Sequence, residues 1–81
     1  MKPSRTSLEA EILRQVTARG RGKTICPSDV ARALGDDWRD LMPEVRAVAA
    51  ELAARGALRI TQGGQSVDAL TARGPIRLGL P

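Results

Sequence analysis

The sequence has no histidine, tyrosine or phenylalanine, one tryptophan, and one cysteine, Cys26. A chain without histidine and with a single thiol has no His/Cys zinc cluster, no intramolecular disulfide and no Ser-His or Cys-His catalytic pair. Most familiar catalytic constellations are therefore excluded. We expect a protein that is not an enzyme, holds no metal or cofactor and has no evident small-molecule substrate.

Long hydrophobic runs are also missing. Residues 1–5 are charged but lead into residues 6–9 without the apolar segment of a signal peptide. Nowhere does the chain reach the roughly 18 consecutive apolar residues that a membrane span requires. We therefore expect a cytoplasmic protein that does not enter the membrane.

What the chain does contain is the composition of one small globular domain. It has 81 residues, of which 42% are hydrophobic and 27% charged. We expect residues 1–81 to form a single domain, with residues 1–5 as a disordered tail. Thirteen Lys and Arg against nine Asp and Glu give a net charge of +4, which favours a polyanion or an acidic protein surface as partner.

Two helices are predicted in the first half of the chain. Residues 6–9 match a capping box, and apolar residues at helical spacing follow as far as Gly20, which predicts a helix over about residues 7–18. Pro27 suits the first position of a second helix, which Gly35 ends.

The third predicted helix runs from about Pro43 to Arg55. Pro43 disfavours helical geometry at Met42, so we place the helix start at the proline. Residues 36–41 before it are predicted to form a connecting turn, with at most one helical turn. The predicted core stripe of the third helix is Val45, Val48, Ala49 and Leu52.

After Gly56 the hydrophobic period changes from 3.6 to 2. Residues 58–61 and 76–80 alternate as two antiparallel strands, and residues 24–26 suit a very short strand. Residues 62–75 are predicted to form a long loop, tethered by Val67 and Leu70. This order of elements predicts an α+β winged helix-turn-helix, with three helices and a small antiparallel sheet.

Three segments resemble a family of short bacterial proteins described as a domain of unknown function. They are ICPSDVARAL at residues 25–34, WRDLMPEVR at 38–46 and ARGPIRL at 72–78. The resemblance covers nearly the whole chain after residue 6. It implies a winged-helix fold and brings with it no activity and no functional residues.

Residues 20–24 approach the phosphate-loop pattern of nucleotide-binding proteins. That pattern requires glycine at position 17, where this chain has Thr17, and a strand instead of a helix before the loop. We interpret the segment as a basic loop whose cations contact phosphates.

Other single residues favour structural roles over chemical ones. Cys26 suits a small helix cap better than a reactive thiol, and Trp38, as the sole aromatic, favours core packing over contact with a DNA backbone. Asp36, Asp37 and Asp40 match a capped turn better than a metal site or a catalytic carboxylate pair.

Positive charge is concentrated outside the third helix. Residues 36–56 hold three arginines against five carboxylates, whereas residues 1–35 hold seven cations against three carboxylates and residues 57–81 three against one. In a helix-turn-helix the third helix enters the major groove and should carry donors for base edges. It carries few.

Two hypotheses about function remain open. In the leading one, the chain is a duplex-DNA-binding module similar to a transcription regulator: Ala47 and Ala50 allow close approach, Arg46 reads bases, and other cations hold phosphates. The candidate nucleic-acid-binding residues are Arg19, Arg21, Lys23, Arg39, Arg46, Arg59, Arg73 and Arg77. Arg59 and Arg77 are equally compatible with an ordinary solvated surface.

The alternative hypothesis is a protein-interaction module or a homodimer without DNA binding. Its candidate contact is the small-residue face of the third helix, formed by Pro43, Ala47, Ala50 and Ala54.

Overall fold

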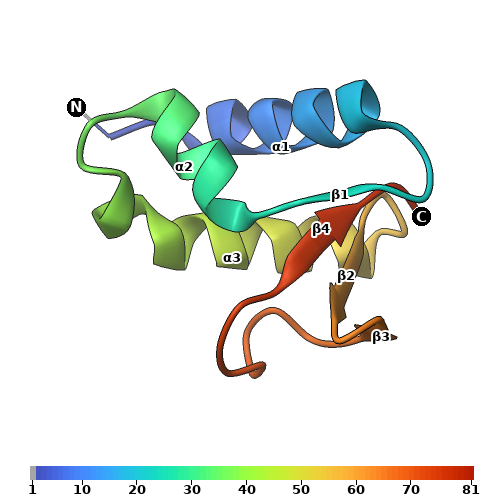
Figure 1. The fold of residues 1–81 in the computed structure, drawn as a ribbon. Coiled ribbons are helices and arrows are strands. Elements are labelled where there is room, and N and C mark those ends of the chain that lie inside the picture. The colour runs from blue at the N-terminus through green and yellow to red at the C-terminus, as the bar shows by residue number, and fades with distance from the viewer. Residues whose placement is uncertain (1) are drawn as a thin grey trace.

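The computed structural model describes residues 2–81, which form three helices and one four-stranded antiparallel sheet (Figure 1). The elements are α1 (Arg5–Arg19), β1 (Thr24–Ile25), α2 (Pro27–Leu34), α3 (Trp38–Ala54), β2 (Arg59–Gln62), β3 (Gln65–Ser66) and β4 (Arg77–Gly79). The α+β class is confirmed, and the arrangement is compatible with a winged helix-turn-helix. None of these helices combines the length and apolar character of a membrane span.

Helix α1 begins two residues earlier than the sequence pattern predicted. Ser4 is its N-cap, and the Ser4 Oγ accepts a hydrogen bond of 3.1 Å from the backbone N–H of Ser7. The prediction of a capping box at residues 6–9 is therefore wrong, because the N-cap is Ser4 and residues 6–9 already lie inside the helix. Arg5, expected in a disordered tail, is the first helical residue, and Met1 of that tail lies outside the described residues.

Helix α2 has the predicted bounds. Cys26 occupies the N-cap position, Pro27 the first helical position, and Gly35 follows the last. The backbone N–H of Cys26 donates to the Asp29 carboxylate over 2.9 Å, which ties down the start of the helix. The prediction that Cys26 serves as a helix cap is confirmed in position.

Helix α3 begins at Trp38, five residues before the predicted start, so Pro43 lies inside it. A proline there removes one helical hydrogen bond, because it has no N–H to donate to the carbonyl of Arg39. The predicted start was wrong because burial of side chains in the first turns of the helix stabilises it by more than the lost hydrogen bond costs. Leu41 is only 4% exposed, and Trp38 packs against the core from the first turn.

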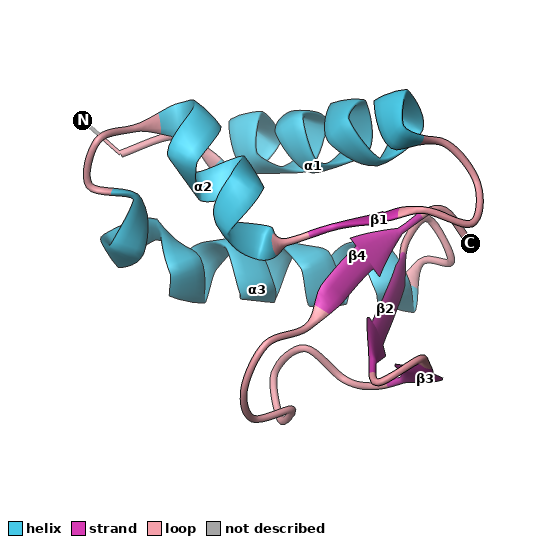
Figure 2. Ribbon diagram, in the orientation of Figure 1, coloured by secondary structure: helices cyan, strands magenta, loops and turns pink. Residues whose placement is uncertain are grey.

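The sheet has the strand order β1-β4-β2-β3 (Figure 2). Its central row pairs Ile25 with Leu78 and Leu78 with Ile60, and all three side chains are buried. The predicted antiparallel strands near residues 58–61 and 76–80 are thus confirmed. Their alternate residues face away from the core.

Part of the predicted loop at residues 62–75 forms a hairpin instead. Gly63 and Gly64 both have positive φ, of 59° and 83°, and make the tight turn that pairs β2 with β3. Beyond it, Val67 is half-buried as predicted, but Leu70 is 68% exposed and does not tether the loop. Ala69, 1% exposed, takes the inward position.

The core lies between α1, α3 and the inner face of the sheet. Helices α1 and α3 run in the same direction, and the sheet packs beside their C-terminal halves (Figure 1). The largest fully buried side chains are Leu8, Ile12, Leu52, Ile76, Leu78, Val16, Val30 and Val45. The core stripe predicted for the third helix, including Leu52, is confirmed.

Candidate nucleic-acid interface

All four glutamates of the chain are engaged in ion pairs with cations of the helices and of the N-terminal segment. One pair joins α1 to α3, one joins α1 to Arg55 at the C-cap of α3, and one lies within α1. We use the name helical face for the eight residues concerned, of which Arg14 and Glu11 lie on the side of α1 that is turned towards β1 and α2: Lys2 with Glu44 at 3.5 Å, Arg5 with Glu51, Arg55 with Glu9 at 2.9 Å, and Arg14 with Glu11 at 2.5 Å.

The Arg14–Glu11 pair changes the acidity of both groups. The hydrogen bond from Arg14 lowers the pKa of Glu11 below its ordinary value. Partial burial opposes this effect, and a further hydrogen bond from Gln15 supports it. The same pair raises the pKa of Arg14. Arg14 is therefore a cation that already has an anionic partner.

The turn between α2 and α3 forms an acidic end of the molecule. Asp36, Asp37 and Asp40 are exposed there. Trp38 is half-buried against the core, and the guanidinium carbons of Arg32 and Arg39 each lie 4.4 Å from its ring centroid. Within residues 2–81, no three His, Cys, Asp or Glu side chains are placed to hold a metal ion.

Arg46, the expected reader of bases, instead holds the loop between β3 and β4. Its guanidinium donates to the carbonyl oxygens of Ala72 at 3.0 Å, Gly74 at 2.5 Å and Ala69 at 3.4 Å. The side chain is half-buried under this loop. Arg39 stacks on Trp38 and Arg46 binds the loop, so neither is part of the surface that the remaining candidates form.

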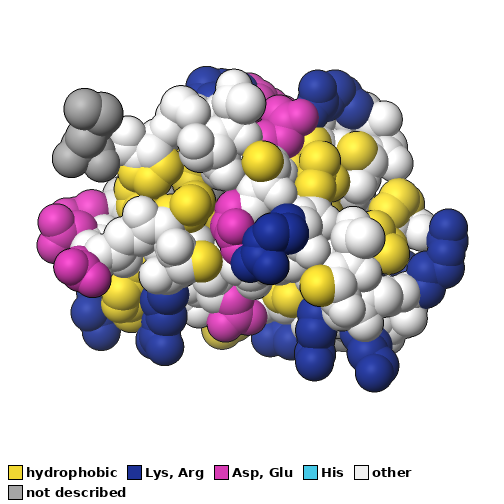
Figure 3. Space-filling model, turned by 90° about the horizontal axis from the view of Figure 1, so that it is seen from above, with side chains coloured by type: hydrophobic (Ala, Val, Ile, Leu, Met, Phe, Trp, Pro, Cys, Tyr) yellow, Lys and Arg dark blue, Asp and Glu magenta, His cyan; other side chains and the backbone are white. Residues whose placement is uncertain are grey.

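The other six candidates lie on the sheet or on the segments that flank it. None of them forms an ion pair with a side-chain carboxylate of residues 2–81, and Arg21 donates from Nη1 to the backbone oxygen of Pro81 at 3.2 Å. In Figure 3 acidic side chains lie at the left edge and in the middle, with some Lys and Arg at the lower left, whereas only Lys and Arg colour the charged surface towards the right-hand end. We call these six residues the sheet surface: Arg19, Arg21, Lys23, Arg59, Arg73 and Arg77.

Small and hydroxyl-bearing residues lie between these cations. On the outer face of the sheet Gly79 stands in register between Thr24 and Arg59, and Thr61 beside Arg77. A Cβ at position 79 would lie 3.0 Å from the Lys23 carbonyl oxygen, so only glycine allows β1 to approach this closely.

A hollow of about 200 Å³ lies beside Gly79 on this surface. Lys23, Arg59, Thr24 and Thr61 are among the residues that line it. Ammonium, guanidinium and hydroxyl groups are the donors that proteins use for phosphate oxygens. The hollow therefore presents donors of the kind that bind phosphate oxygens.

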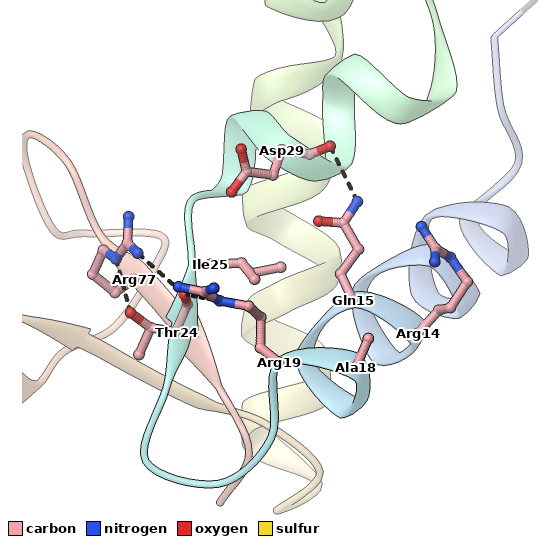
Figure 4. A pocket seen from close by; sticks show the side chains of 8 residues that line it. All are labelled: Arg14, Gln15, Ala18, Arg19, Thr24, Ile25, Asp29 and Arg77. Atoms are coloured by element: carbon pink, nitrogen blue, oxygen red, sulfur yellow. Dashed lines mark hydrogen bonds between the residues drawn. The ribbon is translucent and has the colours of Figure 1, made fainter.

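A second cleft, of about 430 Å³, lies between α1 and β1 (Figure 4). Arg77 donates from Nη2 to the Thr24 carbonyl oxygen at 3.1 Å and from Nε to the Thr24 Oγ1 at 2.9 Å. Arg19 donates from Nε to the same carbonyl oxygen at 3.4 Å. Two guanidinium groups from distant parts of the chain therefore meet at one backbone oxygen.

The small-residue face of α3 is only partly free. Pro43 and Ala54 are exposed, but Ala47 and Ala50 are half-buried. Ala50 and Ala54 line a groove of about 510 Å³ against the segment after β3, whose lining also includes Val67, Ala69 and Leu70. Two of the four residues of the alternative hypothesis thus border a groove, and the four do not form one flat seam.

The sequence matches the family described as "Protein of unknown function (DUF3253)" over residues 5–81. The chain belongs to the DUF3253 family. The resemblance inferred from the three sequence segments is confirmed. No curated protein matches the chain. The family description gives no function, so the candidate interface of this DUF3253 chain is argued from its geometry alone.

Sequence reasoning missed Thr24, Thr61 and Gly79 as site residues. A signal for two of them was present. The alternation of residues 58–61 and 76–80 places Thr61 and Gly79 on the same outward face as Arg59 and Arg77. The predicted set of site residues was chosen by charge alone and therefore did not include these uncharged residues.

Proposed function

We propose that this protein is a non-enzymatic, cytoplasmic module that binds duplex DNA, as transcription regulators do, mainly through the phosphate backbone. The observation that carries the proposal is the contrast in ion pairing. All four glutamates are paired on the helical face, while the six cations of the sheet surface have no side-chain carboxylate as partner among residues 2–81. Positive charge that no side-chain carboxylate neutralises is therefore concentrated on the sheet and on the segments that flank it.

Backbone contacts dominate this binding mode. Arg46 and Arg39 are engaged within the protein, so α3 presents few donors for base edges. Binding through phosphates is largely independent of sequence and depends steeply on salt, because each neutralised phosphate releases counterions. A single domain of this size binds weakly, so a dimer or a partner that adds a second contact strengthens it.

A salt series tests the proposal. Fluorescence anisotropy of a labelled duplex of random sequence should give a log-log slope of about −3.6 for four phosphate contacts, at about −0.9 for each contact. Lys23→Gln and Arg59→Gln should each reduce the slope by about 0.9 on every duplex.

Arg5→Gln is the matched control for this experiment. It removes the same charge from an exposed residue whose cation is paired with Glu51, so the slope should stay unchanged. The DNA-binding proposal fails if anisotropy stays flat at micromolar protein in low salt, or if Arg5→Gln reduces the slope as much as Arg59→Gln does.

A protein-interaction module or homodimer is the second candidate function. It is favoured by Leu70, a large hydrophobic residue that is 68% exposed at the groove lined by Ala50 and Ala54. Sedimentation of the wild type and of Leu70→Ser and Ala50→Arg tests it. A dimer that both variants dissociate, together with flat anisotropy, would favour this function over DNA binding.

A further inference from the structure

We propose that the cleft between α1 and β1 is a pocket for a single phosphate group, held by Arg19 and Arg77. This inference rests on the proposed function, because the phosphate is one that the bound DNA supplies. It goes beyond that function by assigning one phosphate to one place, whereas the rest of the sheet surface needs only unoriented cations.

The first argument is the meeting of two like charges. Arg19, at the end of α1, and Arg77, on β4, both donate to the carbonyl oxygen of Thr24 (Figure 4). A carbonyl carries no net charge, so it orients the two guanidinium groups without neutralising them. An anion placed between them relieves the repulsion that this arrangement creates.

The second argument is that the cations that line the cleft outnumber its acidic groups. Asp29 is the acidic residue in the lining, and its carboxylate accepts from the backbone N–H of Cys26 at 2.9 Å. Arg14, the third cation of the lining, is paired with Glu11. The N–H of Cys26 orients the Asp29 carboxylate without neutralising it. This negative charge offsets one of the two positive charges of Arg19 and Arg77, so the lining keeps an excess of positive charge.

The third argument is the supply of unused donors. A guanidinium has five N–H groups, of which Arg77 uses two and Arg19 one in the hydrogen bonds described above. The Thr24 Oγ1 accepts from Arg77, which leaves its own O–H to donate. Forked guanidinium donors together with a hydroxyl fit the tetrahedral oxygens of a phosphate.

The dimensions of the cleft also fit this ligand. Its volume of about 430 Å³ exceeds that of a phosphate group, and Ala18 and Ile25 are part of the lining. The remaining space accommodates the sugar to which the phosphate is attached. Both an internal phosphodiester and a terminal 5′-phosphate have this chemistry, and the experiment separates them.

The first measurement uses inorganic phosphate as the probe. Nitrogen–proton NMR spectra of the arginine Nε–H groups and of the Thr24 amide are recorded during titration, with sodium chloride at equal ionic strength as the reference. Saturable shifts at Arg19, Arg77 and Thr24 are expected. Arg19→Gln and Arg77→Gln should each weaken phosphate binding by about tenfold, the typical effect of losing a charged hydrogen bond.

Arg14→Gln is the matched control, because Arg14 lines the same cleft but is paired with Glu11. It should change phosphate affinity by less than about twofold. Because Arg77 also holds β4 to Thr24, thermal melts of each variant check the fold. Arg19→Gln, at an exposed helix end, supplies the test if Arg77→Gln is unstable.

The second measurement compares duplexes with 5′-phosphate and 5′-hydroxyl ends by anisotropy. Tighter binding of the phosphorylated duplex, lost in Arg19→Gln, assigns the pocket to a strand end. Equal affinity for the two duplexes, with a salt slope that Arg19→Gln reduces by about 0.9 on both, assigns it to an internal phosphate.

The pocket and the DNA-binding function fail in different ways. Saturable phosphate binding that depends on Arg19 and Arg77, with no duplex binding, retains the pocket and overturns the function. Duplex binding that depends on Lys23 and Arg59 but is unchanged in Arg19→Gln and Arg77→Gln overturns the pocket. Phosphate shifts that grow linearly, as those of chloride do, overturn it as well.

Discussion

The helical face and the sheet surface are both rich in cations, and they differ in what those cations contact. On the helical face each of Lys2, Arg5, Arg14 and Arg55 has a glutamate partner. On the sheet surface, six cations have backbone carbonyls, hydroxyl groups or solvent around them. The comparison teaches that pairing of charges, more than their number, distinguishes a candidate interface from an ordinary solvated surface.

The largest effect is predicted for a substitution in the hydrophobic core, which lies between the two regions. Leu52 is 1% exposed in the core between them, so Leu52→Ala should lower the free energy of unfolding by about 2–5 kcal/mol. Urea denaturation measures it. Leu70→Ala makes the same chemical change at an exposed position and should change stability by less than about 0.5 kcal/mol. Equal losses of stability in the two variants would show that Leu52 does not pack in the core.

The second prediction compares the two regions directly, at equal change in net charge. Lys23, Arg59 and Arg73 replaced together by Gln should weaken duplex binding on the order of a hundredfold at low salt, because three unpaired cations are lost. Lys2, Arg5 and Arg55 replaced together by Gln should weaken it by less than about threefold. Anisotropy on one duplex measures both. Similar losses in the two triple variants would show that net charge alone governs binding.

The third prediction concerns Arg46, which belongs to neither region. Arg46→Ala removes three hydrogen bonds to carbonyls of the β3–β4 loop, so stability should fall by about 1–3 kcal/mol. The salt slope of DNA binding should stay unchanged, because this guanidinium faces the loop. Thermal unfolding and anisotropy measure the two effects. A loss of one phosphate contact without loss of stability would place Arg46 in the interface after all.

The smallest predicted effect is a pH dependence from the helical face. The pKa of Glu11 is lowered in the folded state, mainly by the hydrogen bond from Arg14. Its contribution to stability is therefore complete above the unfolded-state pKa, near 4.3, and is lost as pH falls through the lower folded-state pKa. Melting temperatures between pH 6 and pH 3 should fall more for the wild type than for Glu11→Gln. Parallel curves would contradict this prediction.

Much of the fold was predictable because its signals are local. Pro27 and Gly35 mark the two ends of α2, and the alternation after Gly56 marks β2 and β4. The start of α3 was not predictable from Pro43. Whether the helix extends past the proline depends on whether burial of Leu41 stabilises it by more than one lost hydrogen bond costs, and that burial depends on the tertiary fold. The exposure of Leu70 was not predictable for the same reason, because it depends on the tertiary fold and not on the local sequence.

The site was predictable in composition and not in arrangement. The sequence already placed positive charge outside the third helix. It did not reveal that Arg19 and Arg77 meet, because their contact depends on the pairing of β1 with β4. Nor did it reveal that Arg46 is used within the protein, because the loop carbonyls it binds come from residues more than twenty positions away.

The sheet ends in two very short edge strands, since β1 and β3 each have only two residues. Such an edge offers few free backbone groups on which a strand from another molecule can align. Two copies of this chain therefore have little means of joining their sheets into one, and the same feature works against aggregation through edge pairing. Assembly of copies is therefore expected to use contacts between side chains instead of pairing of edge strands.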